Sequence, residues 1–151
     1  MSTSHVEKRA YELFQGGLHC AEAACTAILE SEEGWNQQPE AAKAASAFGA
    51  GVGRSKAEIC GALSGSLIAL GILRGRSGPS EPWDDVAALA HAFRENFQLH
   101  NDCTRCGELL ERFGPQENME QCKRMTARTA GMMRELLDRR VQESIPICCR
   151  P

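Results

Sequence analysis

Cysteine is the residue type that most directly suggests chemistry in this chain, which has eight of them among 151 residues. Thiolates bind zinc and iron–sulfur clusters, and thiols exchange with disulfides. The cysteines are Cys20, Cys25, Cys60, Cys103, Cys106, Cys122, Cys148 and Cys149. Their share of the sequence is below that of short secreted chains that disulfides hold together. Metal, cluster or redox chemistry is therefore the first hypothesis.

Composition excludes several other classes of protein. The net charge of −3 and the pI of about 5.8 argue against a nucleic-acid binder. The longest apolar stretch, residues 59–73, is interrupted by glycines and serines and is too short for a membrane span. The N-terminal residues contain no apolar stretch of the kind found in signal peptides. We therefore expect a cytoplasmic protein, in which thiols stay reduced.

The elements that must position the cysteines are predicted to be helices, because apolar residues recur every three or four positions and no segment alternates as a strand does. Ser4 is the expected N-cap of the first helix, and Glu7 is its capping-box partner. Gly16 and Gly17 could split that helix in two. The predicted helices are 4–28, 40–48, 59–73, 84–99 with Asp84 as N-cap, and 118–143, with a short helical turn through 106–110.

The predicted fold class is therefore all-α, a single helical bundle of about five helices. Residues 1–144 form its one domain, and 145–151 form a C-terminal tail. A glycine-rich connection, residues 49–54, precedes the central helix. In that helix Gly61, Gly65 and Ala69 form a stripe of small residues, which lets another backbone approach closely. The Gly- and Ala-rich helix face would also suit a homodimer.

Four of the cysteines fall where a bundle can bring them together. Cys20 lies on the apolar face of the first helix, while Cys60, Cys106 and Cys122 lie at or near the starts of later elements. Four thiolates satisfy a tetrahedral zinc ion or an iron–sulfur cluster, and buried thiolates without a metal are costly. A helix N-terminus lowers the pKa of a thiol, which favours Cys60, Cys106 and Cys122 as thiolates.

Five sequence elements together resemble a known family. They are FQGGLHCA at 14–21, GAGVGR at 49–54, CGALSG at 60–65, CGELL at 106–110, and Cys122 leading the last helix. In this order they are similar to the C_GCAxxG_C_C family, named for its four cysteines, over residues 14–137. The resemblance implies redox activity. It also makes an iron–sulfur cluster plausible, because a similar domain occurs in some multihaem cytochromes alongside an iron–sulfur centre.

The remaining cysteines depart from that pattern. Cys103 forms a Cys-x-x-Cys motif with Cys106, which suits a redox pair, a shared metal site or no special role. These two cysteines are the redox candidates if the protein is an enzyme, although no catalytic motif is present. Cys25 is expected in the core, and Cys148 and Cys149 in the tail. Residue 107 is glycine, so no haem-attachment motif follows Cys106.

Three functions remain open from the sequence. The first is an iron–sulfur or other metal-thiolate protein for electron transfer or redox sensing, with Cys20, Cys60, Cys106 and Cys122 as ligands and an unidentified redox partner protein. The second is a metal-free thiol–disulfide protein, in which two of these cysteines cycle. The third is a structural zinc-binding helical module. No nucleic acid and no membrane span is expected in any of them.

Overall fold

The computed structural model describes residues 1–35 and 38–144, with side chains described as far as residue 139. Within this part of the chain the fold is all-α and contains no strand, which confirms the predicted class. There are seven α-helices rather than about five, with one short 3₁₀ helix. The helices are α1 (Thr3–Gln15), α2 (Cys20–Glu30), α3 (Pro39–Lys43), η1 (Ser46–Phe48), α4 (Gly61–Arg74), α5 (Asp84–Asn101), α6 (Cys106–Phe113) and α7 (Glu120–Ser144).

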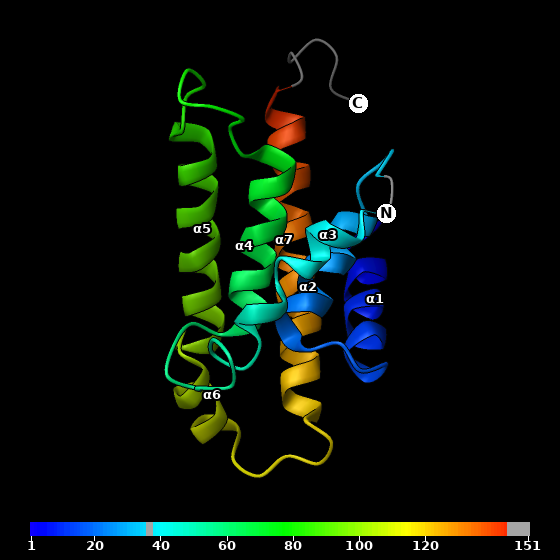
Figure 1. Ribbon diagram of the computed structural model, residues 1–151, viewed down its shortest axis with the longest axis vertical. Coiled ribbons are helices and arrows are strands. Elements are labelled where there is room, and N and C mark those ends of the chain that lie inside the picture. The colour runs from blue at the N-terminus through cyan, green and yellow to red at the C-terminus, as the bar shows by residue number, and fades with distance from the viewer. Residues whose placement is uncertain (36–37, 145–151) are drawn as a thin grey trace.

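Helix α7 is the axis of the molecule, and α1, α2, α4 and α5 all pack against it. Figure 1 shows α5 on one side of α4 and α7, and α1 and α2 on the other. The main core is continuous across these helices and includes Ile28, Leu63, Phe93, Met133 and Leu137. Its side chains are mostly small or aliphatic, as the low aromatic content predicts.

The first predicted helix is divided at the glycine pair. Gly17 has a φ of 114°, a conformation that side chains rarely adopt, and α1 therefore ends and α2 starts in a new direction. Helix α1 buries Val6, Ala10 and Phe14, which lie on one face of the helix. The N-cap prediction was wrong: the N-cap is Ser2, whose carbonyl accepts bonds from His5 and Val6, so Ser4 lies inside the helix.

Helices α2 and α4 cross at the stripe of small residues. A methyl group added to Gly65 would overlap the carbonyl oxygen of Ala21, so the two backbones are in direct contact there. Gly61 lies one turn earlier and faces the start of α2 in the same way. The stripe predicted from the sequence therefore serves packing within the chain.

The predicted helix 40–48 is the largest error in the secondary structure. Only α3 and η1 form, because the chain changes from α-helical to i→i+3 hydrogen bonds after Lys43. Ala45 N–H bonds Ala42 O at 3.0 Å, and Phe48 N–H bonds Ala45 O at 3.0 Å. This tightening brings Phe48 O close to the N-terminus of α4.

Helix α5 follows the prediction closely. It buries Leu89, Phe93 and Phe97 on one face and ends two residues later than expected, at Asn101. Its N-cap is Trp83 rather than Asp84, which is the first helical residue. Beyond α5 the chain pairs briefly with the segment before α4, through an isolated antiparallel bridge between Ile59 and Arg105.

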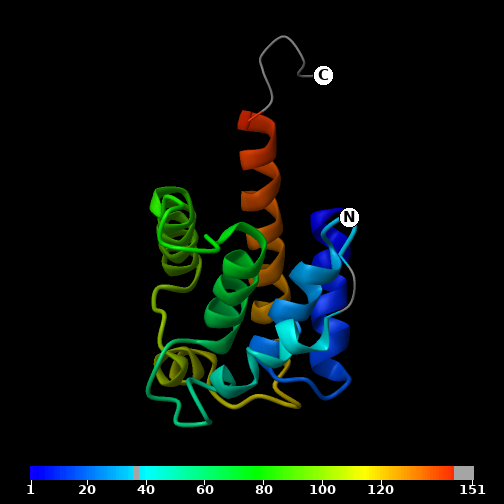
Figure 2. The same ribbon diagram turned by 45° about the horizontal axis from the view of Figure 1, so that its top comes forward.

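The starts of four helices converge at one end of the molecule. Helices α2, α4, α6 and α7 all begin at the lower end of the view in Figure 1, and Figure 2 shows the same end with the glycine-rich connection folded across it. No helix in residues 1–35 and 38–144 is long and apolar enough to cross a membrane. The predicted tail, with Cys148 and Cys149, lies outside the described residues.

Candidate functional site: a cavity lined by four cysteines

The four cysteines singled out from the sequence line one small cavity of about 70 Å³. Each comes from the start of a different helix. Cys60 is the N-cap of α4, while Cys20 and Cys106 are the first residues of α2 and α6. Cys122 lies in the first turn of α7. The convergence of helix starts described above therefore gathers four thiols from distant parts of the sequence.

The rest of the cavity wall is mainly apolar. Phe14, Leu109, Leu110 and Met125 contribute large side chains from α1, α6 and α7. Cys60 and Cys122 are buried, while Cys20 and Cys106 are partly exposed. One side of the cavity is therefore open to approach from solvent, and the remainder is closed by hydrocarbon.

Burial and the neighbouring thiols both raise the pKa values of cysteines in this cavity. Burial raises the pKa of Cys60 above its usual range, and charge on Cys20 and Cys106 raises it further. Burial also raises the pKa of Cys106, with added contributions from Cys20 and Cys122. The pKa of Cys122 rises through burial and through Cys20. Cys20 therefore interacts with each of the other three thiols.

These shifts correct one sequence-based expectation. Placement at helix N-termini predicted lowered pKa values for Cys60, Cys106 and Cys122, and all three pKa values are raised. The backbone N–H groups of Ala62 and Leu63 do favour the thiolate of Cys60. Loss of hydration outweighs them, because burial penalises the charged form. The raised pKa values keep the thiols of Cys60, Cys106 and Cys122 protonated at neutral pH.

Backbone hydrogen bonds hold Cys60 and Cys106 in fixed relative positions. Cys60 N–H bonds Thr104 O at 2.8 Å, and Cys106 N–H bonds Glu58 O at 2.9 Å. Gly107 N–H bonds Lys56 O at 2.7 Å. Together with the bridge at residues 59 and 105, these bonds tie the segment before α4 to the segment before α6.

Glycine at position 61 makes room for Cys20. A methyl group at this position would occupy the place of Cys20 Sγ, and it would lie 3.1 Å from Phe48 O. The Cys-Gly pair therefore has a direct physical reason: Cys60 faces the cavity while the next residue lets a second sulfur reach it. Any larger residue at 61 displaces Cys20 or separates α2 from α4.

The glycine-rich connection forms a left-handed turn beside the cavity. Residues 50 to 54 all have positive φ, including the β-branched Val52 at 68°. For each non-glycine residue this conformation costs about 1–2 kcal/mol. Gly51 is the position that no other residue could fill, since a methyl there would lie 2.7 Å from Cys106 Cβ and 2.9 Å from Lys56 Cα.

Gln116 contacts Cys122 through both ends of its side-chain amide. Its Nε2 donates to Cys122 Sγ at 3.3 Å, and its Oε1 accepts from Cys122 N–H at 3.0 Å. The donated bond favours the thiolate and partly offsets the effect of burial on the pKa of Cys122. Gln116 thus fixes the sulfur and supplies positive charge density to it.

A family model agrees with this arrangement. The model described as "Putative redox-active protein (C_GCAxxG_C_C)" matches residues 18–136, well over half of the chain. The chain belongs to this family. The matched range contains all four cavity cysteines, the glycine-rich connection at residues 49–54 and the CGALSG element at residues 60–65. Comparison with curated proteins and with solved structures gave no match.

The other described cysteines of this C_GCAxxG_C_C protein lie away from the cavity. Cys103 is buried, bonds Asn101 O at 3.7 Å, and does not line the cavity although Cys106 does. Burial raises the pKa of Cys103 above its usual value, and Arg112 offsets only part of the rise. No other cysteine contributes to the shift. Cys25 is fully buried in the core, as expected, and burial raises its pKa to about 12.

Sequence reasoning did not find several residues at the site of the C_GCAxxG_C_C protein. Lys56 and Met119 line the cavity, and each has a positive φ in an irregular segment. His19 lines it too, next to Cys20 in the sequence. Gln116 carries no recognisable signal in the sequence. A single chain offers no pattern for such residues, because their positions depend on how loops fold back.

The arrangement of the four cavity thiols differs from that of a site for a single metal ion. Among the described residues, no group of three or more His, Cys, Asp or Glu side chains is arranged to hold a metal ion. The four thiols of the C_GCAxxG_C_C protein share a cavity but do not converge on one point. A single tetrahedral ion needs each sulfur about 2.3 Å away from it.

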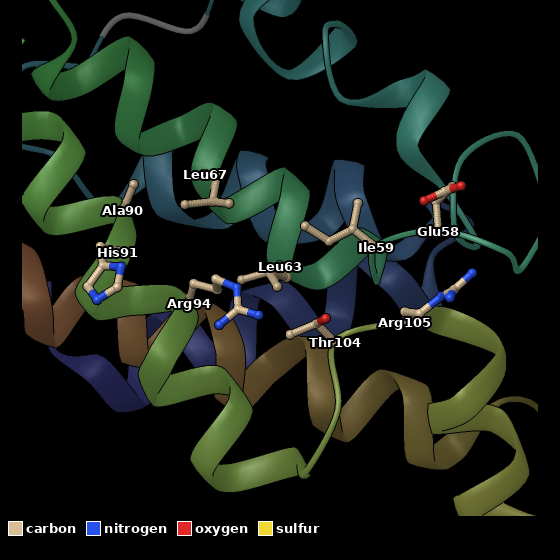
Figure 3. A pocket seen from close by; sticks show the side chains of 9 residues that line it. All are labelled: Glu58, Ile59, Leu63, Leu67, Ala90, His91, Arg94, Thr104 and Arg105. Carbon is tan, nitrogen blue, oxygen red and sulfur yellow. The ribbon is translucent and has the colours of Figure 1, made fainter.

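A larger hollow of about 650 Å³ lies between α4 and α5 and contains no cysteine. Figure 3 shows its apolar wall of Leu63 and Leu67 on α4 and Ile59 just before it, with His91 and Arg94 opposite on α5. It adjoins the bridge that holds Cys60 and Cys106, but on the side away from the thiols. This hollow is a surface groove without thiols, so the cysteine cavity remains the candidate site.

Proposed function

We propose that this protein functions in electron transfer or redox sensing, through an iron–sulfur cluster bound by Cys20, Cys60, Cys106 and Cys122. The observation that carries the proposal is the meeting of four thiols, from four helix starts, on one mainly apolar cavity. Four thiolates are the usual ligand set of two-iron and four-iron clusters. Membership of a family described as redox-active supports the same conclusion.

A cluster and a single ion place different demands on the four thiols. In a cluster the four thiolates bind different metal atoms, so they surround a volume instead of meeting at one point. The four thiols here likewise line the wall of one cavity, of about 70 Å³. The zinc alternative fits less well, because the side chains are not arranged around one position.

The raised pKa values make metal binding at this site dependent on pH. Burial makes thiolates at Cys60, Cys106 and Cys122 unfavourable by themselves. Bound metal supplies the compensating positive charge, so binding releases protons and strengthens as the pH rises. When bound, the cluster would supply one-electron chemistry.

Hydrogen bonds to sulfur would set the electronic properties of the site. The N–H groups of Ala62 and Leu63 favour the thiolate of Cys60, and Gln116 Nε2 donates to Cys122 Sγ. Such donors stabilise negative charge on sulfur and raise the reduction potential of a cluster. The apolar wall limits access of water. We place the protein in the cytoplasm, where its thiols would stay reduced.

A metal-free thiol–disulfide function is the second candidate, and one observation favours it. Cys20 Sγ lies against Gly61, the residue next to Cys60, so these two thiols are the pair that we expect oxidation to join first. Loss of two electrons and two protons to an oxidant would then give a disulfide. This candidate predicts two thiols fewer after mild oxidation and no bound iron.

The test is purification without oxygen, followed by measurement of iron, acid-labile sulfide, zinc and the visible spectrum. The proposal predicts iron and sulfide in stoichiometric amounts and a brown protein. Cys60→Ser should remove both, whereas Cys103→Ala should keep them, because Cys103 lies outside the cavity lining. Stoichiometric zinc without sulfide, or a metal-free chain that forms one disulfide, would refute the iron–sulfur function.

A further inference from the structure

A second, open groove of about 780 Å³ leads to the cysteine cavity. His19, Ala50, Lys56 and Met119 line both hollows, so a molecule in the groove lies at the mouth of the cavity. The groove also contains Arg54 and Ser46. Its volume is within the range of about 300–1,000 Å³ found for small-molecule sites.

The groove is positively charged. Arg54 and Lys56 line it, and no Asp or Glu does. Neither cation forms an ion pair or a side-chain hydrogen bond with another residue in the described part of the chain. The carboxylate that contacts the lining is Glu22, and its two oxygens accept bonds from His19 N–H at 2.9 Å and Ser46 Oγ at 2.8 Å. The two cations are therefore available to a ligand.

The basic residues of the hollow between α4 and α5 differ in this respect. Arg105 donates two hydrogen bonds to Ala57 O and lies within 4.0 Å of Glu108. Arg94 pairs with Glu95 at 2.7 Å. Figure 3 shows Arg94 projecting from α5 toward Leu63 and Thr104, and Arg105 at the far end of the hollow. Among the described arginines, only Arg54 and Arg128 have no side-chain hydrogen bond or ion pair, and of these two only Arg54 lines a hollow described above.

Backbone conformation and hydrogen bonds hold the main chain of Arg54 and Lys56 in place. Arg54 and Lys56 both have positive φ, at 63° and 59°. Arg54 N–H bonds Gly49 O at 3.1 Å, and Lys56 N–H bonds Ala50 O at 3.0 Å. Lys56 O accepts the bond from Gly107 at the start of α6. Unfavourable backbone conformations held this firmly are concentrated at functional sites.

We propose that this groove binds a small anionic molecule, with its phosphate or carboxylate group between Arg54 and Lys56 and its remainder at the mouth of the cysteine cavity. Guanidinium and ammonium groups recognise such anions through charge-assisted hydrogen bonds. Arg54 supplies paired donors and Lys56 a point charge. Met119 and Ala50 provide an apolar surface for the rest of the molecule. This inference goes beyond electron transfer or redox sensing, because it adds a small anionic ligand beside the cysteine cavity.

Calorimetric titration of the full chain, as purified without oxygen, tests the inference. Inorganic pyrophosphate is the first probe and citrate the second, each at an ionic strength held constant with chloride. Saturable binding of pyrophosphate identifies a phosphate site, and saturable binding of citrate alone identifies a carboxylate site. The double variant Arg54→Gln, Lys56→Gln should weaken the binding at least ten-fold.

The matched control is Lys43→Gln, Arg128→Gln, which removes the same charge from exposed side chains elsewhere. It should leave the affinity within two-fold of the unaltered chain. Absence of saturable binding for both probes, or an equal loss in the control, would overturn the proposal. Iron content is measured on the same samples, so failure of anion binding and failure of the iron–sulfur function are observed separately.

Discussion

The contact between α2 and α4 makes a quantitative prediction about Gly65. In Gly65→Ala the new methyl would overlap Ala21 O and lie 2.7 Å from Ala21 C and Cα, whereas ordinary contact begins at 3.4 Å. The atoms that it meets belong to the backbone, so the strain is relieved only if the helices separate. Overpacking of this kind costs about 3 kcal/mol, the upper end of the usual range.

The substitution also has a favourable part, which must be subtracted. Alanine is better than glycine within a helix by about 1 kcal/mol. The net expectation is a loss of about 2 kcal/mol, or about 4–8 °C in Tm for a chain of this size. Urea unfolding followed by far-ultraviolet circular dichroism measures it, under anaerobic reducing conditions that keep all thiols in one state.

Gly71→Ala is the control, because it lies on the same helix and a methyl there would meet nothing within 4 Å. It should raise the free energy of unfolding by about 1 kcal/mol through helix propensity alone. The two variants should therefore differ by about 3 kcal/mol. If Gly65→Ala is as stable as Gly71→Ala, the close approach of α2 and α4 is wrong, and so is the placement of Cys20 beside Cys60.

Three further predictions follow from the site and its support. Gly61→Ala should lower the iron retained per chain, because its methyl would take the place of Cys20 Sγ; unchanged iron would contradict that placement. Arg134→Met should cost about 2 kcal/mol in urea unfolding, since Arg134 is 5% exposed and pairs with Glu32 at 2.9 Å and with Asp138 at 2.8 Å. Arg74 still pairs with Glu32 in the variant, and a loss below about 1 kcal/mol would contradict a buried ion pair. Burial opposes ionisation of Glu32, but Arg134 and Arg74 outweigh it and hold its pKa below the usual value. Its stabilisation is therefore present above the unfolded-state pKa of about 4.3 and is lost as the pH falls through the lower folded pKa, so acid should destabilise the unaltered chain more than Glu32→Gln.

The sequence predicted the helices best where burial has a clear period. In α5, the residues Leu89, Phe93 and Phe97 recur as one face of a helix must, and the structure buries all three. The prediction was wrong at 40–48, although alanine is a strong helix former. There the chain leaves the α conformation to bring Phe48 O against the start of α4, and tertiary contact outweighs propensity.

The left-handed turn beside the cavity was beyond sequence reasoning for a different reason. Glycines at 49, 51 and 53 indicated a tight connection, and three of its non-glycine residues nevertheless adopt positive φ. Val52 is the clearest case, because a β-branched residue is a rare occupant of that region. Hydrogen bonds such as Gly53 N–H to Ala47 O at 2.9 Å hold the turn, and these depend on the surrounding fold.

The four cavity cysteines were found from the sequence because their neighbours also have a pattern. The Cys-Gly pairs at 60 and 106 mark helix starts that other backbone segments approach closely, since a methyl at Gly107 would lie 2.8 Å from Lys56 O. The protonation state was not foreseen correctly. Helix N-termini are visible in a sequence, whereas the loss of hydration that outweighs them depends on the packing of Phe14, Leu109 and Met125 around the thiols.

The central claim is that the four thiols together hold iron and sulfide. The most direct measurement is the iron and acid-labile sulfide content of the anaerobically purified chain, compared with that of Cys60→Ser and Cys103→Ala. Equal amounts of iron and sulfide in the unaltered chain and in Cys103→Ala, with neither in Cys60→Ser, is the predicted result. A colourless, iron-free chain, or iron that survives in Cys60→Ser, would contradict it.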